Sequence, residues 1–214
     1  MRDVIQDATQ MEKKRLEFLE TGFRLFAERS IEAVTLPEVA KEAGYGTATL
    51  YRYFDKKPGF VIAVATWKWE KFTYQIQKRR QNEGFDGMTA AEAFGFYLDS
   101  FLELYRNHAD LLRFNQFFNI YIRSEQLSPD IIQPYQDMID DVEHRFHRIY
   151  EKAEKDHTMR TDIAEKEVFT TTLHLMLAVL TRYAVGLVYT PKDGFNMENE
   201  LLLFRNMLYN QYCR

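Results

Sequence analysis

The densest run of side chains able to hold a partner by hydrogen bonds lies between residues 43 and 54. It reads Ala43-Gly44-Tyr45-Gly46-Thr47-Ala48-Thr49-Leu50-Tyr51-Arg52-Tyr53-Phe54. Its hydroxyls and its guanidinium could bond to phosphates or to base edges, and the small side chains at its start would permit a close approach. Lys57 adds a positive charge shortly afterwards. This chemistry suits the backbone and the edges of a nucleic acid.

The two helices predicted before this run would position it. From Glu12 to Arg29, apolar residues recur at helical spacing among charges, which predicts an amphipathic helix. Thr35 and Glu38 form a capping-box pattern that opens a short second helix, and Gly44 ends it.

A third short helix is predicted from Gly46 or Thr47 to Phe54, before the proline at position 58. Leu50 and Phe54 lie four residues apart and can anchor this helix inward, so its other faces stay available. Three helices with a glycine turn before the last are the parts of a helix-turn-helix unit, whose final helix enters a major groove about 12 Å wide.

The rest of the chain is also predicted to be helical, which makes the fold all-α with about nine helices. Thr89 and Glu92 repeat the capping-box pattern, Asp110 can open a helix, and Ser128-Pro129 reads as a cap followed by a first-turn proline. We expect Pro134 to kink or delay the helix that follows. The later helices are predicted at about 58–81, 89–107, 110 onward, 128–156, 161–189 and 196–212.

Composition indicates a folded chain without disulfides. Hydrophobic residues make up 46% and charged residues 28% of the 214 positions, and there are only 9 Gly and 5 Pro. Cys213 is the one cysteine, which fits a reducing compartment. Residues 173–189 are interrupted by His174 and Arg182, so we interpret them as a buried helix and not as a membrane span. We expect a cytoplasmic protein with no membrane partner.

Charged residues are distributed unevenly along the chain. Residues 1–80 hold 15 Lys+Arg against 11 Asp+Glu, and residues 81–214 hold 13 against 21. The balances of +4 and -8 point to two functional parts, although they do not by themselves indicate a nucleic-acid partner.

Several features in order make the chain resemble the TetR family of bacterial transcriptional regulators. They span about residues 13–62 and comprise Gly22-Phe23-Arg24-Leu25-Phe26-Ala27-Glu28, the helix from Thr35 to Ala43, Ala43-Gly44, Thr49-Leu50-Tyr51-Arg52-Tyr53-Phe54, and Lys57 with Phe60. The resemblance implies a helix-turn-helix DNA-binding domain at 1–57 and a helical effector-binding and dimerisation domain at 58–214. It further implies a homodimer, most often a repressor, that binds a near-palindromic double-stranded DNA operator and is released by a small apolar or aromatic effector.

The resemblance also assigns roles to residues of the run. Positions matching family phosphate contacts are Thr35, Tyr51, Tyr53 and Lys57, and those matching the base-reading start of the third helix are Tyr45, Gly46, Thr47, Ala48 and Thr49. Arg52 is a candidate for a further base or phosphate contact. Where Tyr45 and Gly46 stand, the family commonly has a small aliphatic residue and then Ser. The usual side-chain cap is therefore missing, and Tyr45 could itself contact DNA.

For the second domain, family likeness and the density of aromatic residues predict an apolar effector pocket and a dimer interface. The predicted pocket residues are Phe101, Tyr105, Phe114, Phe117, Phe118, Tyr121, Met138, Phe146 and His174. The predicted interface residues, on the last two helices, are Leu175, Val179, Leu201, Phe204 and Leu208. Any single ring could equally fill a helical core, and His174 is more often a hydrogen-bonded core residue than an effector contact.

Other groups carry weaker hypotheses. Asp140, His144 and His147 share one side of a helix and could offer ligands to a divalent ion, although such a face is usually only solvated. The basic cluster 78–80 is interpreted as a solvated face. We find no nucleophile-elbow motif and no phosphate-binding glycine loop, and we therefore expect no catalytic residues, no metal, no cofactor and no enzyme activity. The alternatives are a helical carrier or sensor without DNA binding and a helical enzyme.

Overall fold

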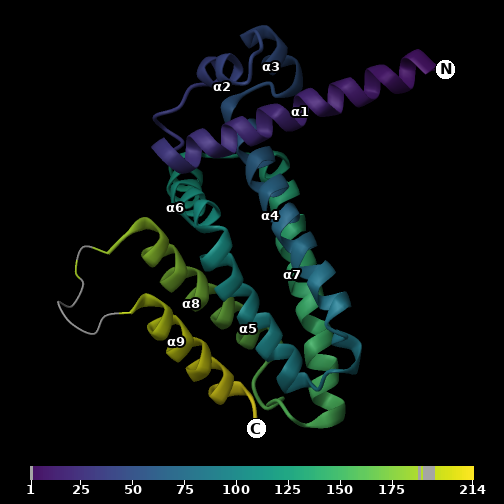
Figure 1. The fold of residues 1–214 in the computed structure, drawn as a ribbon, viewed down its shortest axis with the longest axis vertical. Helices are drawn as coiled ribbons and strands as arrows, with labels where there is room; N and C mark the ends of the chain where they lie inside the picture. The colour runs from purple at the N-terminus through teal and green to yellow at the C-terminus, as the bar shows by residue number, and fades with distance from the viewer. Residues whose placement is uncertain (1, 188, 190–195) are drawn as a thin grey trace. The chain divides into compact units, whose positions relative to one another are not determined.

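The computed structural model describes residues 2–187, 189 and 196–214 and confirms the all-helical prediction. Within these residues the chain forms nine α-helices and one short 3-10 helix (Figure 1). The helices are α1 (Arg2–Arg29), α2 (Leu36–Glu42), α3 (Thr47–Tyr53), α4 (Lys57–Asn82), η1 (Phe85–Gly87), α5 (Ala90–Asn107), α6 (Ala109–Ser124), α7 (Pro129–Asp156), α8 (Glu165–Val185) and α9 (Met197–Tyr212).

The helices form two compact units. Unit 1 comprises residues up to Lys71 together with Arg113–Met138, and unit 2 comprises Phe72–Leu112 and Ile139–Arg214. Unit 1 therefore holds α1, α2 and α3, the start of α4, most of α6 and the start of α7. The functional boundary predicted between residues 57 and 58 stays a prediction.

In unit 1, α2 packs against both α1 and α3 (Figure 1). The predicted capping box opens α2: the Thr35 amide donates to the Glu38 carboxylate at 2.8 Å, and the Glu38 amide donates to the Thr35 hydroxyl at 3.4 Å. Gly44 has φ of +79°, a conformation that side chains with a Cβ rarely adopt. It allows the Tyr45 amide to donate to the Ala40 carbonyl at 2.9 Å and turns the chain into α3.

A close approach of two helices in unit 1 depends on Gly22 of α1. A Cβ at this position would lie 2.4 Å from Cζ of Phe60 on α4. The Phe60 ring is fully buried and packs edge-on against Phe26 and Phe54. The absence of a side chain at Gly22 therefore sets how closely α1 and α4 approach.

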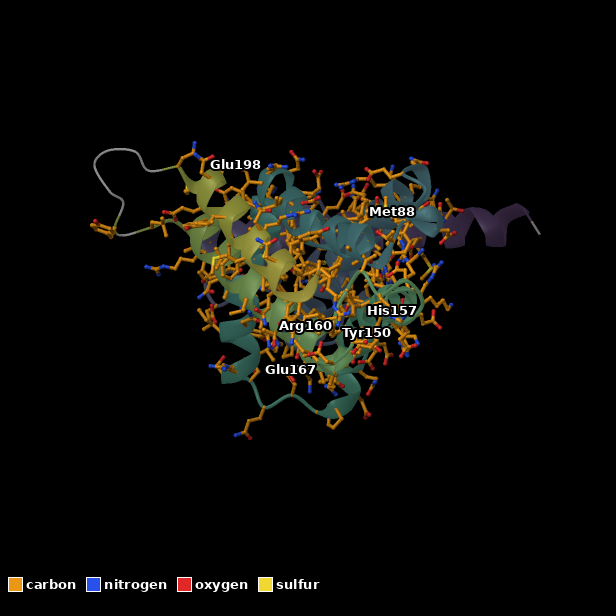
Figure 2. All side chains as sticks on the ribbon, turned by 90° about the horizontal axis from the view of Figure 1, so that it is seen from below. Met88, Tyr150, His157, Arg160, Glu167 and Glu198 are labelled. Carbon is orange, nitrogen blue, oxygen red and sulfur yellow. The ribbon has the colours of Figure 1, made fainter. Side chains whose placement is uncertain are left out.

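In unit 2, α5, α8 and α9 pack against one another, and α8 and α9 run side by side in opposite directions (Figure 1). Arg205 of α9 donates from Nε to Asp99 of α5 at 2.9 Å and from Nη2 at 3.2 Å, a two-point ion pair that orients α9. Tyr150, His157 and Arg160 gather around the segment between α7 and α8 (Figure 2). There the Arg160 amide donates to the carbonyl of Tyr212 at 2.7 Å and joins the C-terminus to this segment.

Two predicted boundaries are wrong, and the delay expected from Pro134 is absent. Helix α1 begins at Arg2 rather than near Glu12, because its polar first turns lack apolar periodicity yet remain helical. Helix α7 includes Pro134 and is not delayed by it, since the helix already begins at Pro129. Helix α8 occupies Glu165–Val185, shorter than the predicted 161–189, because Gly186 with φ of +113° ends it.

Helix α8 also differs from the buried helix predicted for residues 173–189. About a third of its most apolar window is buried, and His174 and Leu175 are exposed. By length and composition α8 could cross a membrane, alone among the helices of the described residues. Most of its buried residues form one stripe that faces the interior of unit 2: Val168, Phe169, Thr172, Met176 and Leu180. Helix α8 therefore has a buried side and an exposed side that carries apolar residues such as Leu175.

Candidate nucleic-acid interface and effector region

Helix α3 presents a polar outer face on apolar anchors. Leu50 is fully buried, and Phe54, which follows the helix as its C-cap, is buried against Phe60 with ring centroids 4.8 Å apart. The side chain of Tyr51 is 46% exposed and Arg52 is exposed beside it. The predicted base-reading residues lie at the start of this face: Gly46 and Ala48 are exposed, and Thr47 and Thr49 are half-buried.

The predicted absence of a side-chain cap on α3 is confirmed. Gly46 is the N-cap residue, in extended conformation, and no side chain bonds to the first helical amides. At the helix start, the Gly46 carbonyl accepts from the amide of Thr49 at 2.9 Å. The amides at the helix start are thus free of a capping side chain.

Tyr45 is held by α1. Its ring packs on Phe18 with centroids 5.1 Å apart, and its hydroxyl donates to the carboxylate of Glu17. This hydrogen bond raises the pKa of Tyr45. The Lys14 ammonium lies 5.9 Å from the Tyr45 ring. A contact between Tyr45 and DNA would therefore use the ring edge, or would replace Glu17 as the partner of the hydroxyl.

Two predicted phosphate contacts already have partners within unit 1. The Thr35 hydroxyl belongs to the capping box and donates to the Glu38 carboxylate at 2.9 Å. The half-buried Lys57 ammonium lies 3.5 Å from the Glu32 carbonyl and 5.9 Å from the centre of the Tyr121 ring. Burial lowers the pKa of Lys57. Tyr53 is half-buried and packs against Phe18 at 5.8 Å.

The basic cluster at the end of α4 is not the solvated face that its sequence suggested. The Arg80 guanidinium lies over the Phe85 ring at 3.3 Å and is half-buried, because η1 folds back beneath it. Burial first, and then the charge of Arg148, lower the pKa of Arg80 to about 10. Arg148 in turn pairs with Asp86 at 2.8 Å. Only Lys78 remains fully on the surface.

The predicted effector-pocket residues divide between the units, and their role stays a prediction. Unit 1 holds Phe114, Phe117, Phe118, Tyr121 and Met138, and unit 2 holds Phe101, Tyr105, Phe146 and His174. All except Phe117, Tyr105 and His174 are buried. His174, predicted for the pocket with a core position as the alternative, is exposed, because it projects from the side of α8 opposite its main buried stripe.

Unit 2 contains buried hydroxyl groups without hydrogen-bond partners in the described part of the chain. They belong to Tyr97, Thr172 and Thr181. The ring of Tyr97 lies 5.2 Å from that of Phe146, which lies 5.4 Å from that of Phe169 on α8. A buried hydroxyl without a partner costs about 1–3 kcal/mol. A polar group of a bound molecule or a water could satisfy these oxygens.

An open pocket of about 550 Å³ lies between α6 and α7 in unit 1. Its lining residues are Gln116, Phe118, Asn119, Ile120, Ile122, Arg123, Ile132 and Tyr135. Of these, sequence reasoning had selected only Phe118. The other lining residues come from two helices. Neither their types nor their spacing in the sequence distinguishes them from residues outside the pocket.

The predicted dimer-interface residues fall on two sides of their helices. Leu175 is exposed, and Val179 and Phe204 are half-buried. Leu201 and Leu208 are instead buried within unit 2, which corrects the expectation that they lie on the surface. The same helix instead exposes Leu202, Leu203 and Met207, because a shift of one or two residues rotates a helical position to another face.

The histidines considered as metal ligands lie on an exposed face of α7. His147 Nδ1 is 2.9 Å from the carboxylate of Glu165, and this hydrogen bond raises the pKa of His147. His144 and Asp140 are exposed. Among the described residues, no group of three or more His, Cys, Asp or Glu side chains is placed to hold a metal ion.

Comparison with known proteins points to one family. Residues 18–64 match the family described as bacterial regulatory proteins, tetR family. A curated relative, the HTH-type transcriptional regulator HbdR of Aromatoleum sp. (strain CIB), is 30% identical over 84 residues, which are 39% of this chain and 36% of that protein. The match thus spans about a third of the relative's length.

Solved structures share the fold over nearly the whole chain. A regulator from Saccharomonospora viridis in complex with choline has a TM-score of 0.72 at 19% identity and covers 95% of this chain and 98% of its own. A regulatory protein in the tetR family from Rhodococcus RHA1 has a TM-score of 0.71 at 14% identity, with 94% and 98% covered. FadR from Bacillus subtilis in complex with stearoyl-CoA has a TM-score of 0.70 at 14% identity, with 91% and 97% covered.

Proposed function

We propose that this chain, a member of the TetR family by its residues 18–64, is a ligand-responsive transcriptional regulator that binds a specific DNA sequence as a homodimer. The observation that carries the proposal is the geometry of α3. Leu50 and Phe54 anchor the helix inward, so that Tyr51, Arg52 and the small residues at its start form an exposed outer face. Such a face fits a major groove.

The proposal assigns two kinds of contact. Residues 45–49 read base edges, and Thr35, Tyr51, Tyr53 and Lys57 hold phosphates. Arg52 adds a contact that is stronger than those of the hydroxyls, since its guanidinium can bond bidentately to guanine or to a phosphate. The amides at the uncapped start of α3 supply further donors.

A homodimer follows from the limited reach of one short helix, which reads only a few base pairs. Two copies held about 34 Å apart would read successive turns of a near-palindromic operator. The exposed apolar side chains of α8 and α9 support pairing through these helices. They include Leu175, Val185, Leu203 and Met207.

The proposed mode is repression that is released by a small apolar or aromatic effector. The open pocket of about 550 Å³ between α6 and α7, most of whose lining residues are apolar, supports an effector of this kind. A coupling of about 1–3 kcal/mol between effector and operator would weaken DNA binding about five- to 150-fold. A cytoplasmic location without membrane contact belongs to the same proposal.

The test begins with selection of bound duplexes from a random library, followed by titration of the selected duplex by fluorescence anisotropy. We expect Arg52→Ala to weaken binding by about 1–3 kcal/mol, and Tyr51→Phe to weaken it less, both with unchanged helicity. Lys78→Gln is the matched control, because it removes one positive charge at an exposed position that does not belong to α3. Unchanged affinity in both α3 variants would refute their roles.

The same experiment separates the alternatives. A selection that enriches no sequence at any salt concentration would favour a helical carrier or sensor without DNA binding. Binding that falls steeply with salt but shows no sequence preference would identify a non-specific basic protein. Substrate turnover in the absence of DNA binding would favour an enzyme.

A further inference from the structure

The pocket between α6 and α7 combines apolar walls with one unpaired cation. Its walls are formed by Phe118, Ile120, Ile122, Ile132 and Tyr135, and its polar lining is Gln116, Asn119 and Arg123. No carboxylate belongs to the lining. A volume of about 550 Å³ lies within the range of about 300–1,000 Å³ typical of small-molecule sites.

Arg123 is the only charged group of this lining, and no carboxylate of the described chain lies within ion-pair distance of it. Two other exposed arginines of unit 1 are paired: Arg24 lies 2.8 Å from Glu42 and Arg29 lies 3.1 Å from Glu38. Arg123 is exposed at the pocket while the neighbouring Phe118 is buried. A ligand that fills the apolar walls can therefore place an anionic end on the guanidinium.

We propose that the α6–α7 pocket binds an amphipathic monocarboxylate, whose carboxylate is held by Arg123 and whose hydrocarbon part lies against Phe118, Ile122 and Ile132. The inference deepens the proposed function and rests on it, because it names the chemical class of the effector. A monocarboxylate matches the single positive charge, and Gln116 and Asn119 can donate amide N–H groups to the same oxygens.

The position of the pocket connects it to the DNA-binding helix within one compact unit. Tyr135 packs on Phe118 at 4.8 Å, and Phe118 stacks with Phe114 at 5.8 Å. Phe114 in turn stacks with Phe26 of α1 at 6.5 Å. Phe26 reaches the end of α3 through two further ring contacts in the buried core of unit 1.

This series of rings gives a ligand a physical route to α3. Close-packed rings cannot move independently, so a molecule that displaces Phe118 must shift its neighbours. Tyr121, on the same helix α6, also lies under the Lys57 ammonium at the start of α4. Occupation of the pocket thus acts on α3 and on the start of α4, which position the proposed DNA contacts.

The test uses the full chain and decanoate as the probe, with decanol and decylamine as probes of equal chain length and different charge. Calorimetry is expected to show saturable binding of one decanoate per protomer, and binding of decanol and decylamine at least tenfold weaker. Arg123→Gln should weaken decanoate binding about tenfold and leave decanol unchanged. Arg113→Gln, on the same helix but outside the lining, is the matched control.

A second variant keeps the proposal testable if Arg123→Gln fails to fold. Ile132→Trp, at a half-buried position of the wall, should fill the pocket and abolish binding of both decanoate and decanol while retaining helicity and operator affinity. Binding of decanoate that is equal in Arg123→Gln and wild type, or equal to that of decanol, would overturn the assignment. So would the absence of saturable binding.

The last step measures the affinity for the selected duplex with and without decanoate. We expect decanoate to weaken operator binding at least fivefold in the wild type and to have no effect in Ile132→Trp. Decanoate that binds yet leaves operator affinity unchanged would overturn its effector class. Because operator affinity without decanoate is measured separately, failure of the proposed DNA binding is distinguished from failure of the pocket.

Discussion

Helices α3 and α9 both combine apolar and polar residues, yet they expose opposite kinds of surface. Helix α3 buries Leu50 and turns Tyr51 and Arg52 outward. Helix α9 buries Leu201 but leaves Leu203 62% and Met207 58% exposed. The first surface suits a hydrated polyanion, and the second suits another apolar protein surface. Which side chains a helix leaves exposed therefore indicates the kind of partner it can bind.

The largest expected effect tests whether the exposed apolar side chains of α9 form the proposed dimer interface. In the double variant Leu203→Glu and Met207→Glu, two charges stand on the proposed dimer surface, and burying them unpaired is costly. We expect the dissociation constant of the dimer to rise at least about 30-fold, or about 2 kcal/mol, as measured by sedimentation equilibrium. Gln136→Glu, an exposed polar position on α7, is the control. An unchanged dissociation constant would exclude this face as the interface.

A smaller effect is expected at the support of α3. Gly22→Ala would place a Cβ 2.4 Å from the buried ring of Phe60, which contacts Phe54 at the end of α3. The free energy of unfolding in urea should fall by about 1–3 kcal/mol. Gly59→Ala is the control, because a Cβ there meets nothing within 4 Å. It should be neutral or stabilising, since Ala favours helix. Equal stability of the two variants would contradict the close approach of α1 and α4.

The smallest effect concerns the cap of α2, which holds α3 in place. Hydrogen bonds from the Thr35 amide, from its hydroxyl and from Arg29 lower the pKa of Glu38 below its ordinary value of 4.5. A carboxyl whose pKa is lower in the folded state stabilises the protein above the unfolded pKa, and this contribution is lost as the pH falls through the folded pKa. Wild type should therefore lose more stability than Glu38→Gln between about pH 5 and 3.

Chemical unfolding at several pH values measures this difference. Glu28→Gln, which removes an exposed carboxylate outside the capping box, should keep the wild-type pH dependence. If Glu38→Gln and wild type lose stability in parallel, the capping box does not contribute through the ionised carboxylate.

Local features of the fold were predictable from the sequence because their causes lie within a few residues. The capping boxes at Thr35 and Thr89 are both present, and Gly44 does adopt positive φ. Leu50 and Phe54 are buried as their four-residue spacing predicts. The uncapped start of α3 followed directly from Gly46.

Features that depend on distant residues were not predictable. Arg80 sits on Phe85 because a turn and η1 return the chain beneath it, and a run of three basic residues carries no sign of this. Leu201 and Leu203 look equally suited to an interface, and only the packing of α9 on α5 and α8 decides which of them is covered. The pocket with Arg123 needs two helices side by side, so no single segment encodes it.

The amino-acid sequence alone determined the helical class, the turn before α3 and the pair of residues that anchor α3, because hydrophobic periodicity, capping and glycine conformation act within one or two helical turns. The tertiary structure decided which apolar residues of α8 and α9 stay exposed, how Tyr45 and Lys57 are held, and where a pocket opens beside Arg123. Those outcomes depend on close packing between segments far apart in the chain, where one residue of rotation changes what a side chain meets.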